Sequence, residues 1–298
     1  MPALRSREIC RQWGNDLNLL KNIRSPLHPL MKWYRWTFEK FPLPDFLIIG
    51  AQKCGTTSLY SYLVQHPGIM SAEHKEIRYF GNPVNRARGH AWYRRQFPTI
   101  SSMKLLEKKL GYSPITGEAS PHMNKPHVPK LVHDLLPNAK LIAILRNPVD
   151  RAFSQYHHHR KVAGWEPLSF EEAIAQSPLK LPDEVIQDEW KYHKNKFRGY
   201  ITKGFYAQQL EAWYQYYSKD SIHILSGEEF FADPAKELKE ILKFLGMPNF
   251  RFECAVPKNI GGYKTKMSQE IRTHLEEIFR PHNRRLYELT GKNFGWPS

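Results

Sequence analysis

The feature that most constrains the fold is a short apolar run followed at once by a glycine-containing turn. Residues 46–50, FLIIG, are too few for a helix and are flanked by Asp and Gly, which predicts a buried strand. Residues 56–67, TTSLYSYLVQHP, carry apolar side chains at helical spacing and end at a proline. Backbone N–H groups at such a strand–turn–helix junction bind phosphate. We therefore predict that residues 50–58, called the glycine loop below, bind an anion.

The glycine loop differs from an ATP-binding loop in the position of its lysine. The ATP pattern G-x-x-x-x-G-K-[ST] places a lysine directly after the second glycine. Here Lys53 precedes Gly55, and hydroxyl side chains follow it. Lys53 would approach the anion from another side and neutralise charge on the leaving oxygen of a shorter phosphate chain. The alternative interpretation is an ordinary turn with a Thr/Ser helix cap. The residues that we expect to line the loop are Lys53, Cys54, Gly55, Thr56, Thr57 and Ser58.

A second anion site is predicted where another apolar run ends. The run KLIAILRNP, residues 140–148, reads as a buried strand, and a helix is expected from Pro148. Arg146 lies at the strand end and Ser154 lies eight residues further on, about two helical turns. Arginine binds phosphate bidentately. Arg151, between these two, is equally suited to a carboxylate partner. The two sites together predict a ligand with phosphates at two separated positions.

Strands that alternate with helices predict an α/β fold with a central parallel sheet flanked by helices in three layers. A third strand is expected at 221–226, further helices at 204–217 and 233–246, and one or two helices at 268–291. Residues 1–43 read as a basic and aromatic extension, and 44–298 as one domain. Within the extension, the aromatic segment 33–41 is expected to pack onto the domain.

The amino-acid composition constrains the cellular environment of the protein more than it constrains the kind of ligand bound. The formal net charge is +15, from 44 Lys+Arg and 29 Asp+Glu, and such a surface attracts phosphates, nucleic acid, anionic lipid or acidic glycans alike. Cys10, Cys54 and Cys254 do not make a disulfide framework, and no Cys/His spacing indicates zinc. No segment reaches the roughly 18 apolar residues of a membrane span. We expect a soluble, cytoplasmic protein.

The two anion sites identify a family. The stretch PDFLIIGAQKCGTTSLYSYLVQHP resembles the 5′-phosphosulfate loop of sulfotransferases that use 3′-phosphoadenylyl sulfate (PAPS), and LIAILRNPVDRAFSQY resembles their 3′-phosphate site. The similarity is strongest to the heparan-sulfate branch and runs in order over residues 44–298. It implies a P-loop-like fold in a soluble, bacterial-type member. It also implies PAPS as donor, 3′-phosphoadenosine 5′-phosphate (PAP) as product and no metal.

The resemblance also implies catalytic roles. Lys53 would stabilise the leaving phosphate, and Glu76, in HKEIRYF (74–80), would take the proton of the acceptor hydroxyl or amine during in-line displacement. Glu73 is close but less well aligned. His74 and His122 remain alternative bases, because histidine titrates near working pH.

Further cofactor contacts and the acceptor are less constrained. Tyr206 matches a family position near the adenine or its phosphate, and NIGGYKTKM (259–267) resembles the loop over the 3′-phosphate side. The register of that loop is ambiguous. Ala119 stands where heparan-type members often have a lysine, which weakens heparan as the acceptor. An acidic glycan, a glycolipid and a small metabolite all stay open, and the oligomeric state is not predicted. The loop candidates are Tyr263, Lys264 and Lys266.

Two competing functions remain from the residues alone. A kinase-like phosphoryl-transfer enzyme would need ATP and Mg²⁺, and the absence of a lysine directly after Gly55 disfavours it. A non-catalytic polyanion binder would use the +15 charge without ordered phosphate pockets, and no recognised nucleic-acid motif supports it. The HHH run at 157–159 does not indicate a metal site, since consecutive helical residues point in different directions.

Overall fold

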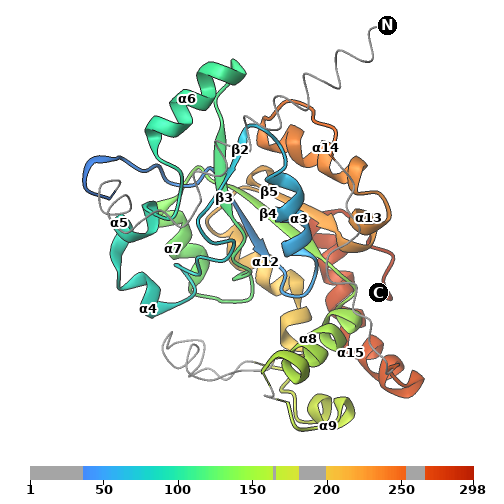
Figure 1. The fold of residues 1–298 in the computed structure, drawn as a ribbon. Helices are drawn as coiled ribbons and strands as arrows, with labels where there is room; N and C mark the ends of the chain where they lie inside the picture. The colour runs from blue at the N-terminus through green and yellow to red at the C-terminus, as the bar shows by residue number, and fades with distance from the viewer. Residues whose placement is uncertain (1–35, 164–165, 181–198, 253–265) are drawn as a thin grey trace, which may run out of the picture.

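The computed structural model describes residues 36–163, 166–180, 199–252 and 266–298. At its centre lies a parallel sheet with the strand order β2-β3-β1-β4-β5 (Figure 1). Because all strands run the same way, their carboxyl ends meet at one edge, where α/β folds bind ligands. The strands are β1 (Phe46–Gly50), β2 (Ile69–Ser71), β3 (Ile115–Glu118), β4 (Lys140–Leu145) and β5 (Ile222–Ser226).

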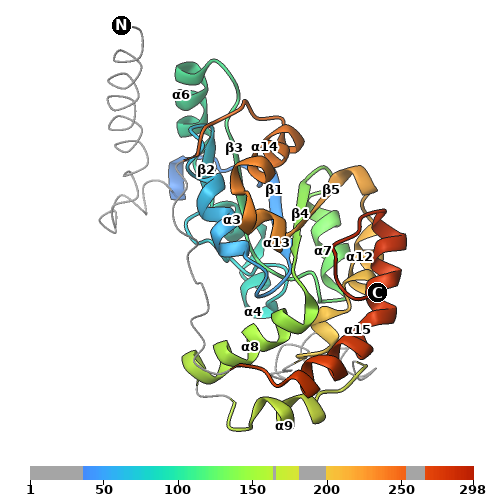
Figure 2. The same cartoon turned by 90° about the vertical axis from the view of Figure 1, so that its right-hand side faces the viewer.

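Helices cover both faces of the sheet, so the predicted three-layer α/β architecture is confirmed (Figure 2). One face carries α3 (Thr56–Leu63), α13 (Gly227–Ala232) and α14 (Pro234–Leu245). The other carries α7 (Val128–Leu135), α12 (Tyr206–Tyr214) and α15 (Gln269–Thr290). The last of these is a single helix that runs through Pro281.

The remaining elements flank this sandwich. The helices α4 (Pro83–Arg86), α5 (Gly89–Arg94) and α6 (Ile100–Leu110) lie in the connection between β2 and β3. Beyond the carboxyl end of β4 come α8 (Pro148–Ala163) and α9 (Phe170–Ala175), and two 3₁₀ turns are η2 (Thr202–Gly204) and η3 (Lys219–Ser221). None of the helices in the described ranges is both long and apolar enough to cross a bilayer.

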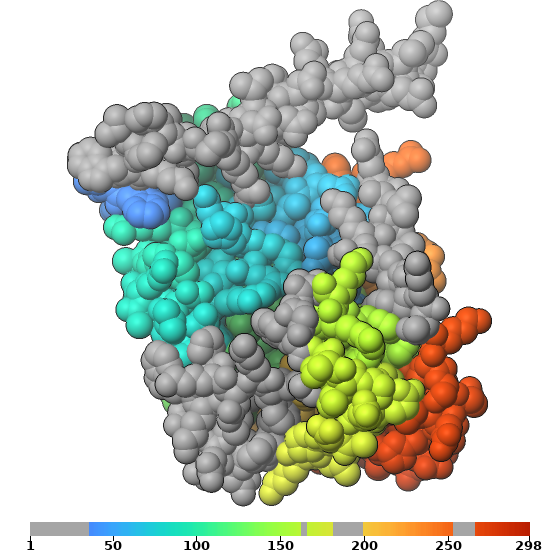
Figure 3. Space-filling view, turned by 60° about the horizontal axis from the view of Figure 1, so that its bottom comes forward, coloured from blue at the N-terminus to red at the C-terminus, as the bar shows by residue number. Residues whose placement is uncertain are grey.

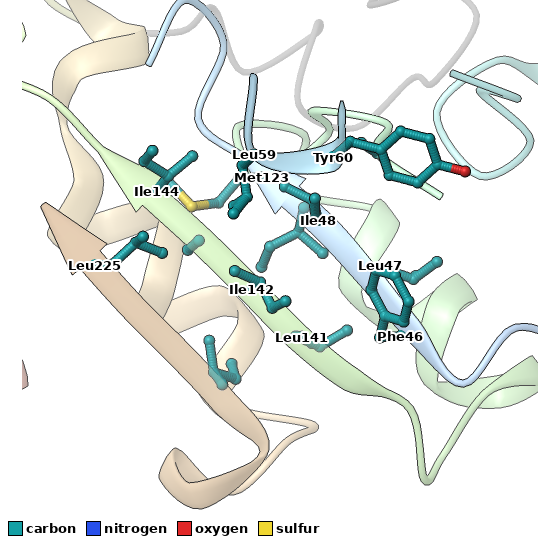
Figure 4. Packing of buried hydrophobic residues seen from close by; sticks show 14 of the residues in the cluster. Phe46, Leu47, Ile48, Leu59, Tyr60, Met123, Leu141, Ile142, Ile144 and Leu225 are labelled. Atoms are coloured by element: carbon teal, nitrogen blue, oxygen red, sulfur yellow. The ribbon is translucent and has the colours of Figure 1, made fainter. Parts of the chain in front are cut away.

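The main hydrophobic core lies on and around β1 and β4 (Figure 4). All five residues of β1 are buried, as the uninterrupted apolar run predicts for a central parallel strand. A second apolar cluster joins α8 to α9 and α15 through Tyr156, Phe170 and Phe279. This second cluster fixes α8 beside the carboxyl edge of the sheet, where the site residues gather.

The aromatic segment before the domain packs onto it as expected, over the part that the structure describes. Phe41 is buried, and the backbone carbonyl of Lys40 accepts a hydrogen bond from the Ile100 amide at 2.9 Å. The Arg95 guanidinium lies 5.5 Å from the centre of the Trp36 ring. The described part of the segment is therefore attached to α5 and α6.

The contact between β3 and β1 leaves no room for a side chain at Gly117. A β-carbon there would lie 2.7 Å from the Phe46 ring and would also collide with the Phe46 carbonyl oxygen. We expect Gly117→Ala to lower the free energy of unfolding by about 3 kcal/mol or more, because the pairing strand cannot move away without losing its ladder. Urea unfolding measures this change. Gly89→Ala is the control, since nothing lies within 4 Å of that site and only its φ of +81° is strained. We expect Gly89→Ala to lower the free energy of unfolding by about 1–2 kcal/mol. Equal losses of stability in the two variants would contradict a collision at Gly117.

Candidate active site

The glycine loop folds tightly at the carboxyl end of β1. The Ala51 amide donates to the Ile144 carbonyl at 2.7 Å, which joins the loop to β4. Lys53 and Gly55 both have left-handed backbones, with φ of 70° and 111°. Gly55 is the residue before α3, so no side chain caps the helix start. The interpretation of this loop as a Thr/Ser-capped turn is therefore wrong, and the first amides of α3 remain suited to an anion.

Positive charge is concentrated beside this loop. Burial lowers the pKa of Lys53, and the charges of Arg146 and Lys75 lower it further. The Lys75 ammonium donates to the Thr57 hydroxyl at 2.8 Å and contacts a Glu76 carboxylate oxygen at 2.8 Å. Lys53 and Arg146 repel one another electrostatically. Sequence reasoning assigned no role to Lys75, because only the fold brings it against Thr57.

Glu76 lies in the same site as Lys53. Its carboxylate accepts a hydrogen bond from Arg78 at 2.6 Å as well as the Lys75 contact, and 26% of its side-chain surface is exposed. Burial alone would raise the pKa of Glu76, but the hydrogen bonds and charges of Lys75 and Arg78 outweigh it, so that its pKa is lowered. The charge of Glu76 in turn acts on Lys53. A carboxylate that is ionised at neutral pH thus stands beside an ammonium group at the mouth of the glycine loop.

A buried carboxylate, that of Glu118, contributes to holding the backbone that follows Glu76. Glu118, at the end of β3, accepts hydrogen bonds from the Tyr93 hydroxyl at 2.8 Å and from the Ile77 amide at 3.0 Å. Ser120 also donates to it, and the Ser120 hydroxyl accepts from the Arg78 amide at 2.9 Å. Burial raises the pKa of Glu118, and the three donors oppose that rise. The two residues after Glu76 are therefore fixed from β3, and Arg78 keeps a left-handed φ of 55°.

The histidines near the site differ in environment. His122 is buried, and burial followed by the charges of Lys125 and Arg78 places its pKa well below the usual value. His158, on α8, is exposed, and its pKa is lowered by burial of part of the ring and by the charge of Lys53, against that of Glu76. His158 was considered in the sequence only as part of an unsuited metal motif. Its position four residues after Ser154 is the signal that could have found it. His74, like Glu73, is exposed on the loop before Glu76.

The residues of the predicted second anion site lie at and after the end of β4. Arg146 directly follows the strand, and Ser154 is buried on α8. Arg151 is fully buried and donates to the Gln155 side-chain oxygen at 2.7 Å and to the Tyr200 carbonyl. Within the described ranges, its hydrogen-bond acceptors are therefore neutral oxygens.

Two of the expected cofactor residues lie behind the glycine loop. The Tyr206 hydroxyl donates to the Arg146 carbonyl at 2.9 Å and lies 3.5 Å from the Cys54 sulfur, and both side chains are buried. Burial raises the pKa of the Cys54 thiol to about 11. These contacts connect the two anion sites from the inside, and direct contacts of these two side chains with a ligand stay a prediction. Tyr263 and Lys264 lie outside the described residues, and Lys266 is exposed.

The start of α13 closes the site from the side of β5. A β-carbon on Gly227 would lie 3.0 Å from the Leu145 carbonyl and 3.2 Å from that of Cys54. The Glu228 carboxylate accepts a hydrogen bond from the Asn147 amide at 2.8 Å. Sequence reasoning missed both residues, since neither belongs to a phosphate-binding pattern.

A parallel α/β sheet with a glycine loop and cationic side chains at its carboxyl edge is typical of proteins that bind phosphate-containing ligands. Residues 43–256 match the family model described as the sulfotransferase domain, and the chain belongs to that family. The expected similarity to heparan-sulfate sulfotransferases is confirmed by the relatives it matches. The class of protein expected from the sequence, a sulfotransferase enzyme, is thereby established.

The relatives differ in how much of their length the chain spans. Bifunctional heparan sulfate N-deacetylase/N-sulfotransferase 4 of Mus musculus is 33% identical over 289 residues, which cover 85% of this chain and 31% of that protein. The chain thus spans about a third of that relative. Heparan sulfate glucosamine 3-O-sulfotransferase 5 of Mus musculus is 28% identical over 277 residues, covering 86% and 74%. Among solved structures, the sulfotransferase from Alicyclobacillus acidocaldarius is 29% identical with a TM-score of 0.62, covering 85% and 97%.

The Glu118 network yields a prediction about stability. An amide at this position has one acceptor oxygen for three donors, so at least one buried donor loses its partner. We expect Glu118→Gln to lower the free energy of unfolding by about 1–3 kcal/mol, measured in urea. Glu240→Gln on the exposed face of α14 is the matched control and should change it by less than about 0.5 kcal/mol. Equal stability of the two variants would show that the network does not hold the 77–78 backbone.

Proposed function

We propose that this protein transfers a sulfuryl group from PAPS to a hydroxyl or amine of a carbohydrate acceptor. The observation that carries the proposal is the placement of Lys53 and Glu76 together at the mouth of the glycine loop. One group carries a positive charge for a leaving oxygen, and the other is an ionised base for an acceptor proton.

The two anion sites fit the donor. The amides at the start of α3, with the hydroxyls of residues 56–58, would hold its 5′-phosphosulfate end. Arg146 and Ser154 would hold the 3′-phosphate at the neighbouring strand end. The donor supplies an activated sulfuryl group, so that its S–O bond to phosphate breaks as the new bond to the acceptor forms. The assignment of these two sites to the donor is supported by the start of α3, which has no side-chain cap, and by the lysine and arginine side chains near it.

Lys53 is suited to the leaving side of the reaction. Lys53 lies within the turn of the glycine loop and has a left-handed backbone. Lys75 and Arg146 add positive charge nearby. Negative charge that develops on the phosphate oxygen is therefore met by a preorganised ammonium group, without the solvent reorganisation that water would require.

Glu76 is suited to the acceptor side. Its lowered pKa keeps the carboxylate ionised, and its partial exposure leaves it accessible to an acceptor hydroxyl. The acceptor proton would pass to this carboxylate as the acceptor oxygen attacks sulfur. His122 is buried and its pKa is well below the usual value, so it is less suited to the role of base. The exposed His158 interacts electrostatically with both Lys53 and Glu76.

Carbohydrate is the acceptor class that the relatives support, because the names of those quoted above refer to heparan sulfate. This chain has a fully buried alanine at Ala119, where heparan-type enzymes often carry a lysine. This difference weakens heparan sulfate itself as the acceptor, so the acceptor is proposed as another glycan.

Donor binding is tested by calorimetric titration with PAP. We expect tight binding without added metal, and no competition from ATP with Mg²⁺. Arg146→Ala should weaken PAP binding about tenfold or more, because a charge-assisted hydrogen bond to phosphate is lost. Arg284→Ala, an exposed arginine on α15, removes the same charge and should leave the affinity nearly unchanged. Undetectable PAP binding to the wild type would overturn the proposal in favour of a kinase-like or a polyanion-binding function.

Catalytic roles are tested with labelled PAPS and a panel of glycan acceptors. Glu76→Gln should slow transfer about 10²–10⁴-fold and Lys53→Ala about 10²–10³-fold, with both proteins still folded. Because the pKa of Glu76 is lowered from its ordinary 4.5, kcat/KM should stay flat from neutral pH down to about pH 5. An acidic limb near pH 6.5, or full activity of Glu76→Gln, would assign the base to a histidine instead.

A further inference from the structure

Lys75 lies between the two halves of the proposed active site. Its ammonium group donates a hydrogen bond to the Thr57 hydroxyl at 2.8 Å and contacts Glu76 Oε1 at 2.8 Å. Thr57 belongs to the glycine loop, whereas Glu76 lies in the irregular segment between β2 and α4. One side chain therefore connects the loop that would hold the donor with the carboxylate that would take the acceptor proton.

The end of β3 fixes the backbone that carries this side chain. The Lys75 carbonyl accepts a hydrogen bond from the Ala119 amide at 2.9 Å, and the Ile77 amide donates to the Glu118 carboxylate at 3.0 Å. Only 22% of the Lys75 side-chain surface is exposed. A side chain that is largely covered and extends from a fixed backbone holds its contacts in one geometry.

The contact with Lys75 determines how the Thr57 hydroxyl can donate. A hydroxyl group has one proton and two lone pairs, and an ammonium group can only donate. The Thr57 oxygen therefore accepts from Lys75, and its own proton points elsewhere. Thr57 is exposed, and its hydroxyl proton has no acceptor within the described ranges of the chain. That proton is thus available to an anion at the glycine loop.

The same ammonium group contacts one oxygen of the Glu76 carboxylate. Oε1 contacts Lys75, whereas Oε2 accepts two hydrogen bonds from Arg78, at 3.0 Å from Nε and at 2.6 Å from Nη2. Each oxygen of an ionised carboxylate has two lone pairs. Among the described contacts, both lone pairs of Oε2 are engaged and one lone pair of Oε1 is left. Oε1, the oxygen that Lys75 contacts, is therefore the one suited to take a proton.

Lys75 also contributes to keeping Glu76 ionised. Burial would raise the pKa of Glu76, and the hydrogen bonds and charges of Lys75 and Arg78 outweigh burial. Loss of Lys75 should therefore raise the pKa of Glu76, because one of the two cations that oppose burial is removed. Figure 3 shows α8 (yellow-green) on the same face of the molecule as the cyan region that contains the Glu76 segment. The charged and titratable groups that interact with Glu76 from neighbouring elements are Lys53 of the glycine loop, Glu118 of β3 and His158 of α8.

We infer that Lys75 is a positioning residue for sulfuryl transfer, which directs the Thr57 hydroxyl proton toward the donor and holds Glu76 as the base. This inference rests on the proposed function and deepens it, since it assigns the link between donor binding and proton removal to one side chain. Lys75 needs no contact of its own with either substrate, because it acts through Thr57 and Glu76. Its removal should consequently weaken donor binding and change the titration of the base together.

The contact with Glu76 is tested with Lys75→Met and with Lys130→Met as its matched control. The Lys130 ammonium contacts the Asp134 carboxylate at 2.8 Å on the exposed surface of α7, so each variant loses one lysine–carboxylate pair. Carboxyl NMR of the ligand-free protein, labelled with ¹³C in its glutamates, follows the titration of Glu76, and Glu76→Gln assigns the resonance. We expect Lys75→Met to raise the pKa of Glu76 and Lys130→Met to leave it unchanged.

The pH profile of transfer from PAPS should change in the same way. A carboxylate base is lost as the pH falls through its pKa, so a raised pKa moves the acidic limb of kcat/KM to higher pH. The ratio of kcat/KM at pH 5 to that at pH 7.5 should fall about threefold or more in Lys75→Met, and in that variant alone. Lys75→Arg, which keeps the positive charge, should restore both the profile and the titration of Glu76.

The contact with Thr57 is tested by calorimetric titration with PAP. Thr57→Val removes the hydroxyl, Lys75→Met removes the group that orients it, and the double variant removes both. If Lys75 acts through Thr57, the two losses overlap. The loss of PAP affinity in the double variant should then be smaller, by about twofold or more, than the product of the two single losses. Lys130→Met should bind PAP as the wild type does.

Two results would overturn the inference. The first is an unchanged titration of Glu76 in Lys75→Met, or in the uncharged Lys75→Gln if the methionine variant does not fold. The second is a loss of PAP affinity in the double variant equal to the product of the single losses, which would give Lys75 a direct contact with the donor. A wild-type protein that binds no PAP would overturn the proposed function instead, and the NMR titration would still decide the contact with Glu76.

Discussion

The parallel pairing of β1 with β4 is the constraint on which the site depends. Leu47 pairs with Leu141 and Ile48 with Ile142, and beyond the last pairs the Ala51 amide continues the connection to the Ile144 carbonyl. Because the two strands end side by side, the glycine loop and Arg146 emerge at the same edge. The buried Tyr206 hydroxyl connects the two segments, since it donates a hydrogen bond to the Arg146 carbonyl and contacts the Cys54 sulfur. The glycine loop and the end of β4 are thus joined into one unit.

Glu76, the proposed base, is held by a separate set of contacts. Glu76 lies in an irregular segment, where no ladder of backbone hydrogen bonds would hold it. Glu118 and Ser120, at the end of β3, replace that ladder by accepting the amides of Ile77 and Arg78. Lys75 then joins this segment to Thr57 of the glycine loop. The segment of the proposed base is in this way joined to the loop of the proposed leaving-group cation, and transfer chemistry requires such fixed positions.

Much of the fold could be predicted from the sequence, and the elements that could not be predicted were missed for physical reasons. The strands β1 and β4 are almost entirely apolar, and the edge strand β5 (IHILS) is mostly so, which lets periodicity and length identify them. β2 is only three residues long, and β3 contains Gly117 and Glu118, so neither shows such a run. In the site, Lys53, Arg146 and Glu76 were found from motifs. Lys75, Glu118 and His158 were missed because their partners are distant in sequence.

The sequence by itself determined the α/β class, the glycine loop and the family, since these depend on local runs and fixed spacings along one segment. Only the tertiary structure decided which charges meet. It paired Glu76 with Lys75 and Arg78, and it gave Arg151 neutral acceptors among the described residues. The reason is that electrostatic energies depend on distance and burial, and both arise only when separate elements pack against one sheet edge.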